Sequence, residues 1–231
     1  MKKNAVVTGA AGNLGKAVVR KLLEAGYWVI GTISPGKDDP EQVSHPNFES
    51  YPLDVTDQKA INDFIHYTVA KMGQIHFSAL LVGGFDMHSF EDTSLEDIHK
   101  MMKLNFETAF ISSQTIFKQM KQQPTGGIIL FVGAKPAIEK GASKGMTAYA
   151  LSKSLIFKLA EHINTEGADY QVQASVIVPS VIDTPQNRKA MPNADFSQWI
   201  TPEQIAESIL FLANQPPRLM HETILKLYGN A

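Results

Sequence analysis

The chain has 231 residues, of which 44% are hydrophobic and 19% charged, and its formal net charge is -2 with a sequence pI of about 6.4. This length fits one large α/β domain over residues 1–231. The near-neutral charge excludes a strongly basic surface of the kind that binds nucleic acid or an anionic membrane. The absence of cysteine excludes disulfides and thiolate chemistry, and no apolar run reaches the ~18 residues that span a bilayer, so we expect a soluble, cytoplasmic protein without a metal site.

The first apolar stretch, residues 5–7, is followed by the run Thr8-Gly9-Ala10-Ala11-Gly12-Asn13-Leu14-Gly15 and then by a helical pattern to Ala25. This order predicts a strand, a glycine turn and a helix. Glycines let a backbone approach a pyrophosphate, and the free N–H groups of a helix N-terminus attract its charge. A plain strand-to-helix turn is the alternative, but the position at the first strand favours dinucleotide binding.

The second predicted strand, residues 27–33, ends without the acid that NAD-binding versions of this unit place about twenty residues after the glycines. The hydroxyls of Thr32 and Ser34 and the ammonium of Lys37 stand there instead. These groups suit a 2′-phosphate, so we expect NADP(H), with NAD(H) as the alternative cofactor.

Strands and helices alternate through the rest of the chain, with further strands predicted at residues 48–53, 76–82, 128–132, 172–178 and 223–227, and helices at 57–71, 94–122, 147–163 and from 201 onward. Alternation with short connections predicts a Rossmann-type, doubly wound parallel sheet of about seven strands with helices on both faces. In such sheets ligands bind at the carboxyl ends of the strands, where Asp54, Gly83, Gly84, Ala134 and Pro179 are expected.

Tyr149 and Lys153 are four residues apart on a predicted helix, so they share one face. A nearby cation favours the phenolate, and such a pair can make a phenol usable as a proton donor or acceptor. Alone, the spacing is equally typical of an amphipathic surface. The same holds for Asn105, a poor helix former in the middle of a predicted helix, which a structural hydrogen bond would also explain.

In order and spacing, these residues resemble the short-chain dehydrogenase/reductase family over almost the whole chain. The resemblance implies that Tyr149 donates the proton during hydride transfer, that Lys153 binds the nicotinamide ribose and lowers the phenol pKa, and that Asn105 holds a water for proton return. It implies contact with the cofactor for Gly9, Ala11, Gly12, Asn13, Leu14, Gly15, Thr32, Ser34, Lys37, Asp54, Val55, Val82, Gly83, Gly84, Lys153, Pro179, Val181 and Thr184. It also implies a homodimer or homotetramer.

The chain departs from the family pattern where most members carry a serine thirteen residues before the tyrosine, because Pro136 stands there. With Gly133-Ala134-Lys135-Pro136 and the run 183–196, this departure is similar to the quinonoid dihydropteridine reductase branch. We therefore expect a reductase of a small carbonyl or quinonoid pterin-like substrate. A dihydropteridine reductase proper and a non-catalytic NADP(H)-binding redox sensor are the alternatives. The candidate substrate wall, with a loop at about 180–201, contains Phe85, Ala134, Lys135, Met191 and Trp199.

Overall fold

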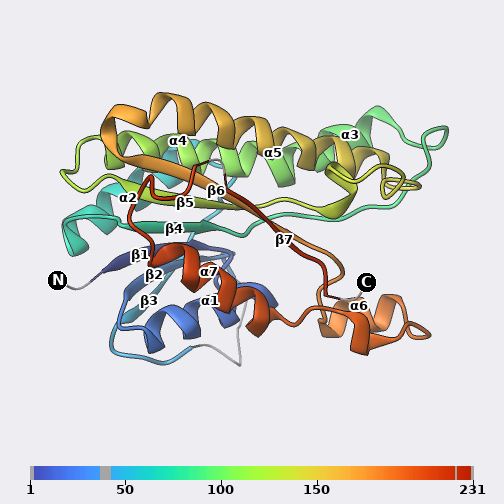
Figure 1. Cartoon of the computed structure of the whole chain (residues 1–231), viewed down its shortest axis with the longest axis horizontal. Helices are drawn as coiled ribbons and strands as arrows, with labels where there is room; N and C mark the ends of the chain where they lie inside the picture. Colours follow the sequence, from blue (N-terminus) through green and yellow to red (C-terminus); the bar gives the residue numbers. More distant parts are fainter. Residues whose placement is uncertain (1–2, 37–42, 222, 230–231) are drawn as a thin grey trace.

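A seven-stranded, wholly parallel sheet forms the centre of the molecule, with the strand order β3-β2-β1-β4-β5-β6-β7 (Figure 1). The computed structural model describes residues 3–36, 43–221 and 223–229. The strands are β1 (Asn4–Thr8), β2 (Trp28–Ile33), β3 (Phe48–Pro52), β4 (Phe77–Leu80), β5 (Gly127–Val132), β6 (Val172–Pro179) and β7 (Ile224–Leu227). The predicted doubly wound sheet is thereby confirmed. The order reverses between β1 and β4, which in such sheets opens a ligand crevice at the carboxyl ends.

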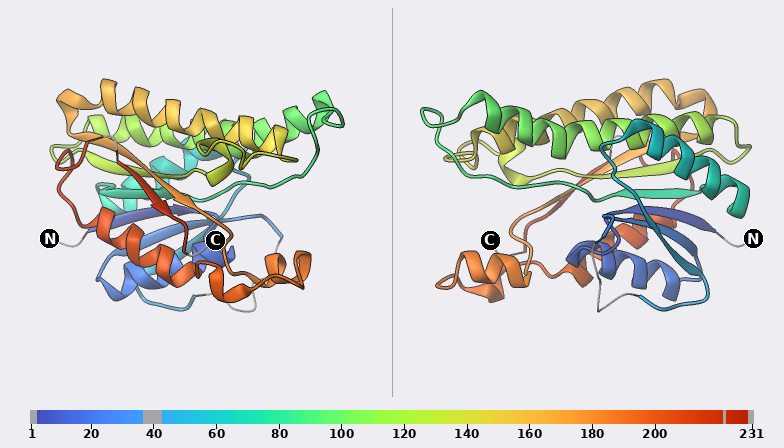
Figure 2. Two further views of the ribbon diagram at one scale, coloured as in Figure 1. Left: turned by 45° about the vertical axis from the view of Figure 1, so that its right-hand side comes forward. Right: turned by 180° about the vertical axis from the view of Figure 1, so that it is seen from behind.

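Helices cover both faces of the sheet (Figures 1 and 2). One face packs against α1 (Asn13–Glu24) and α7 (Pro202–Ala213), and the other against α2 (Gln58–Met72), α4 (Thr108–Lys121) and α5 (Thr147–Glu166). The central strands are therefore covered twice. Ala5, Val6 and Val7 of β1 are fully buried, and each larger apolar side chain buried in this way contributes about 1.5 to 3 kcal/mol.

Side-chain caps start several helices where the sequence predicts them. The Asp57 side chain accepts hydrogen bonds from two backbone N–H groups of α2, and Gly73 ends that helix. Ser94 forms a capping box with Asp97 at the start of α3 (Leu95–Met101), and Thr201 forms one with Gln204 at α7. These caps satisfy N–H groups that have no partner inside a helix.

The helix predicted over residues 94–122 is not one regular element. It is divided into α3, a π-helical turn η1 (Met102–Glu107) and α4. The wider π turn carries Asn105, and such turns are frequent at functional sites. The sequence did not reveal the break, because the residues from α3 through η1 to α4 contain no proline or glycine that would interrupt a helical pattern.

Two other segments also differ from the sequence-based expectation. The strand predicted at 76–82 ends at Leu80, so the chain from 81 to 88 runs outside regular structure. The loop region after β6 contains a short helix α6 (Pro185–Ala190), a 3₁₀ turn η4 (Phe196–Gln198) and a bridge between Ile182 and Ile200. Two more 3₁₀ turns are η2 (Lys135–Ala137) and η3 (Ala168–Tyr170).

Among the described residues, no helix combines the length and apolar character that crossing a membrane requires.

Candidate active site

The turn after β1 is built from glycines that no other residue could replace without displacement. Gly9 has a φ of +71°, a conformation that favours glycine. A Cβ on Gly15 would lie 2.1 Å from the Gly9 carbonyl oxygen, and one on Gly12 would lie 3.3 Å from the same atom. The backbone is thus drawn into a compact loop with no side chain inside it.

The loop leads into the N-terminus of α1, which has no side-chain cap and no acid in its first turn. The N–H groups of such a first turn have no partner within the helix and carry the positive end of its dipole. The predicted residues Ala11, Asn13 and Leu14 lie here, and the Asn13 side chain is exposed. These residues fit the pyrophosphate of a dinucleotide.

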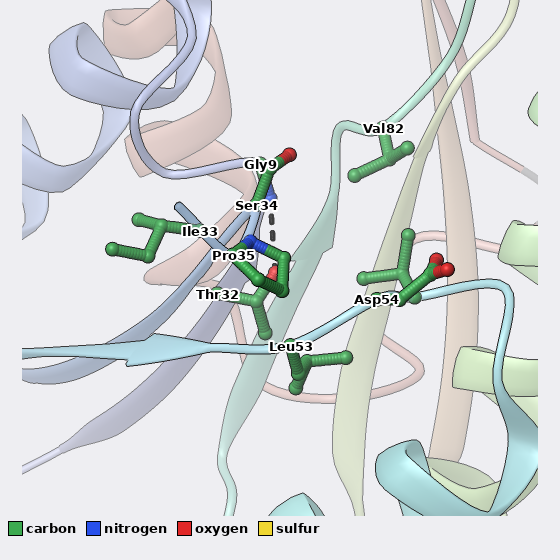
Figure 3. A pocket seen from close by; sticks show the side chains of 9 residues that line it. Gly9, Thr32, Ile33, Ser34, Pro35, Leu53, Asp54 and Val82 are labelled. Carbon is green, nitrogen blue, oxygen red and sulfur yellow. Dashed lines mark hydrogen bonds between the residues drawn. The ribbon is translucent and has the colours of Figure 1, made fainter. Parts of the chain in front are cut away.

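A cleft of about 370 Å³ opens beside this loop, between the ends of β1, β2, β3 and β4 (Figure 3). It is lined by Gly9, Thr32, Ile33, Ser34, Pro35, Leu53, Asp54, Val55 and Val82. The structure therefore gathers six predicted cofactor residues around one cavity, from four segments far apart in the sequence. Its polar and apolar lining fits the adenosine half of a dinucleotide.

The two hydroxyls predicted for a 2′-phosphate play different parts. Thr32 is only 1% exposed, and its Oγ1 accepts a 3.2 Å hydrogen bond from the Gly9 N–H, the bond drawn in Figure 3. The Thr32 hydroxyl thus stabilises the glycine turn by accepting this hydrogen bond. Ser34 is exposed at the rim of the cleft, and Lys37 lies outside the described residues.

Asp54 is the one acid that lines this cleft within the described residues. Its carboxylate accepts a 2.9 Å hydrogen bond from the Thr56 N–H, and that bond holds the pKa of Asp54 below its usual value. The side chain is an anion at neutral pH and can accept hydrogen bonds from an amino group or a hydroxyl.

Asn105 is buried and fully engaged with the turn that follows β4. Its Oδ1 accepts the Gly84 N–H at 2.8 Å, while its Nδ2 donates to the Gly84 carbonyl at 3.1 Å and to the Ser152 Oγ at 3.0 Å. A Cβ on Gly83 would lie 2.7 Å from Asn105 Oδ1 and 3.2 Å from Lys153 Nζ. The amide oxygen and the ammonium therefore approach the same bare backbone position, which a side chain at 83 would fill.

Lys153 and Tyr149 lie on the first turns of α5, at this edge of the sheet. The Lys153 Nζ donates a 2.9 Å hydrogen bond to the carbonyl of Val132, the last residue of β5, and burial lowers the pKa of Lys153 to about 8. Burial also raises the pKa of Tyr149 to about 12. Desolvation thus opposes the lowering of the phenol pKa that the family resemblance implies, and it keeps the phenol protonated at neutral pH.

Phe85 covers Tyr149 from the side of the β4 loop. The two rings meet edge to face, with centroids 4.9 Å apart and an interplanar angle of 77°. Phe85 remains 59% exposed, so part of its ring is free at the mouth of the site. Of the predicted substrate residues, it is the one whose contact with Tyr149 the structure records.

The other predicted substrate residues occupy different surroundings. Ala134 is buried just past β5, and the Lys135 ammonium lies 4.9 Å from the centre of the Tyr228 ring. Met191 is exposed at the end of α6, whereas Trp199 is 9% exposed and packs on Phe196. Trp199 thus contributes mainly to the internal packing of the loop.

The predicted contacts after β6 support that loop. Pro179 is the last residue of β6, the Val181 carbonyl accepts the Ile200 N–H, and the Thr184 side chain caps α6. Sequence reasoning did not single out Ser152 or Val132, although Ser152 bonds to Asn105 and Tyr149, and Val132 bonds to Lys153. Ser152 stands directly before Lys153 in the sequence, but a backbone carbonyl partner such as that of Val132 cannot be recognised from residue type.

Comparisons with known proteins agree with this arrangement. A family model described as short chain dehydrogenase matches residues 3–195. A dihydropteridine reductase of Dictyostelium discoideum is 26% identical over 212 residues, covering 90% of this chain and 87% of the relative. An acetoacetyl-CoA reductase of an Acinetobacter strain is 24% identical over 229 residues, with coverages of 93% and 91%. The solved structure of ElxO with NADP bound shares the fold, with a TM-score of 0.90 at 23% identity over 99% of this chain and 98% of that one.

Proposed function

Because this chain belongs to the short chain dehydrogenase family, we propose that it is a reductase that uses NADPH to reduce a small carbonyl or quinonoid pterin-like substrate. Membership makes it an NAD(P)-dependent oxidoreductase. The observation that supports the finer proposal is the meeting of Asn105, Lys153 and the bare Gly83 backbone at one point of the carboxyl edge. Three segments far apart in the sequence supply these groups.

The choice of NADPH depends on the end of β2. No acid stands between Thr32 and Lys37, and Ser34 is exposed at the rim of the cleft that Asp54 also lines. An acid at this position would repel a 2′-phosphate, and its absence leaves room for one. The bound NADP in the ElxO structure, which has the same fold, supports this choice.

When bound, the nicotinamide supplies a hydride to the substrate. Lys153, which donates to the Val132 carbonyl, would hold the nicotinamide ribose through its ammonium, and Asn105 keeps the Gly84 backbone in position. Tyr149 donates the proton, since its raised pKa keeps the phenol protonated at neutral pH.

The substrate class follows from what is missing near Tyr149. Pro136 stands where most members carry a serine that holds a carbonyl oxygen, and the strand end offers Gly133-Ala134 in place of a serine. The phenol is then the main group that binds the acceptor atom, which suits a conjugated, already polarised ring. The exposed part of the Phe85 ring offers such a substrate a flat apolar surface. The dihydropteridine reductase relative supports this class, and a dihydropteridine reductase proper is its narrowest form.

The experiment is a titration with NADPH and NADH, followed by a turnover panel of simple carbonyls, quinones and quinonoid dihydropterin. Tyr149→Phe should lose most turnover and keep NADPH affinity, whereas Tyr170→Phe, a change at an exposed tyrosine beyond the other end of α5, should match the wild type. Full turnover in Tyr149→Phe would contradict the proposed role of the phenol.

A second candidate is a redox sensor that binds NADP(H) without turnover, favoured by the absence of a serine at Ala134 and Pro136. Tight NADPH binding without consumption across the whole panel would support the sensor.

We also propose that the protein forms a homodimer or homotetramer through α4 and α5, where Phe110 is 40% and Leu151 54% exposed. Sedimentation of the wild type and of Leu151→Lys tests this assembly.

A further inference from the structure

Ser152 joins Tyr149 to Asn105 through a single hydroxyl group. Its Oγ donates to the Tyr149 carbonyl at 2.8 Å and accepts from the Asn105 Nδ2 at 3.0 Å. The side chain is completely buried, so water does not compete for either bond. The hydroxyl thus uses its one donor and one of its two acceptor sites.

The bonds of Ser152 continue into the turn that lies beside the proposed nicotinamide position. The Asn105 amide accepts the Gly84 N–H and donates to the Gly84 carbonyl, so a chain of hydrogen bonds runs from the backbone of α5 through Ser152 and Asn105 to Gly84. Asn105 sits on the π-helical turn η1, which lacks the regular bonding of the helices on either side. The Asn105–Ser152 hydrogen bond ties this turn to the helix that carries the phenol.

We propose that Ser152 is a positioning residue, which fixes Asn105 and the 83–84 turn relative to Tyr149 and Lys153 without touching the substrate. This inference rests on the proposed function. In such a site, a displacement of about 1 Å can lower the rate roughly 100-fold. Loss of the hydroxyl should therefore lower kcat more than it weakens cofactor binding in the cleft near Ser34.

The chain offers a matched control in Ser113. This serine is 1% exposed, lies within a helix, and donates to the carbonyl three residues earlier, that of Phe110, as Ser152 does to Tyr149. Ser113→Ala therefore removes the same local bond and leaves a similar space, but it does not affect Asn105. Any effect shared by the two variants is a general cost of removing a buried hydroxyl.

The experiment compares Ser152→Ala with Ser113→Ala in kcat, KM and NADPH affinity, and in amide hydrogen exchange of the cofactor-free protein. We expect Ser152→Ala to lower kcat about 10-fold or more, with NADPH affinity changed less than about threefold, and to speed exchange at Gly84. Ser113→Ala should do neither. Equal kcat in the two variants, or unchanged exchange at Gly84, would overturn the inference.

A double-variant cycle tests the route through Asn105. If Ser152 acts through Asn105, Ser152→Ala should cost nothing more in the Asn105→Ala background, whereas an independent role would give additive losses and contradict the proposal. Should Ser152→Ala not fold, Ser152→Cys takes its place, because a thiol weakens both hydrogen bonds and, being slightly larger than a hydroxyl, leaves no cavity. Absence of wild-type turnover across the panel would instead count against the proposed function, and exchange at Gly84 would still decide the link between Ser152 and Asn105.

Discussion

The Lys153 ammonium donates a 2.9 Å hydrogen bond to the carbonyl of Val132 and is buried at the end of β5. A backbone carbonyl at the end of a strand thus binds the cation that the predicted chemistry requires. This single hydrogen bond only partly offsets the free-energy cost of removing the ammonium from water. The lowered pKa of Lys153, about 8 against an ordinary 10.5, reflects this balance. Function and stability therefore oppose each other at this residue.

The first prediction concerns pH and this lysine. Activity should fall as the pH rises through about 8, because the ammonium that holds the ribose is then lost. Below that pH the lysine is charged in both the folded and the unfolded chain, and the cost of burying the charge is fully present. Between about pH 8 and 10.5 the unfolded chain binds more protons at this lysine than the folded chain does. The free energy of unfolding therefore increases as the pH rises through this range.

Lys153→Met checks both statements. The variant should lose turnover, yet its Tm at pH 7 should equal or exceed that of the wild type, because an apolar side chain of similar length replaces a buried charge. The Tm difference should narrow between pH 8 and 10. A marked drop in Tm at pH 7 would show that the bond to Val132 stabilises the fold more than burial of the charge opposes it.

The second prediction concerns Phe85. Phe85→Leu removes the edge-to-face contact with Tyr149 and the flat surface offered to a planar substrate. An aromatic pair contributes about 0.5 to 1.5 kcal/mol, so loss of the ring contact between Phe85 and a planar substrate should lower kcat/KM roughly 2- to 12-fold. Phe90→Leu is the control, because Phe90 belongs to the same loop and is 87% exposed. Equal values in the two variants would remove Phe85 from the substrate site.

The third prediction concerns cofactor choice at the end of β2. Ser34→Asp places a carboxylate at the rim of the cleft, where it repels a 2′-phosphate and accepts hydrogen bonds from a ribose hydroxyl. NADPH affinity should fall about 10-fold or more, while NADH affinity stays or improves. Ser44→Asp adds the same charge at an exposed serine that does not line the cleft and should leave both affinities unchanged. A wild type that binds NADH more tightly than NADPH would contradict the reading of this strand end.

The fourth prediction concerns the bare backbone at Gly83. The Cβ of Gly83→Ala would lie 2.7 Å from Asn105 Oδ1, closer than such contacts allow, and 3.2 Å from Lys153 Nζ. Relief of the clash should destabilise the protein by about 1 to 3 kcal/mol and displace both polar groups. Turnover should fall more than the loss of Tm explains at a temperature where the variant is folded. Wild-type kcat in this variant would mean that Asn105 and Lys153 need not keep their present positions.

The sequence predicted much of the fold because its signals are local. Apolar strands, the caps Asp57, Ser94 and Thr201, and the glycine turn after β1 each express the preference of a few neighbouring residues. Alternation of these elements leaves few topologies for a parallel sheet. The family and the doubly wound parallel sheet follow from such patterns, whereas the order of the strands came from the structure.

The tertiary structure decided what depends on partners far apart in the chain. It placed the Val132 carbonyl within hydrogen-bonding distance of the Lys153 ammonium and turned the Thr32 hydroxyl toward the Gly9 N–H. It also opened a π turn at Asn105 and brought Ser152 within hydrogen-bonding distance of it. Backbone carbonyls, helix irregularities and burial come from packing between distant segments, so the local sequence carries no signal for them.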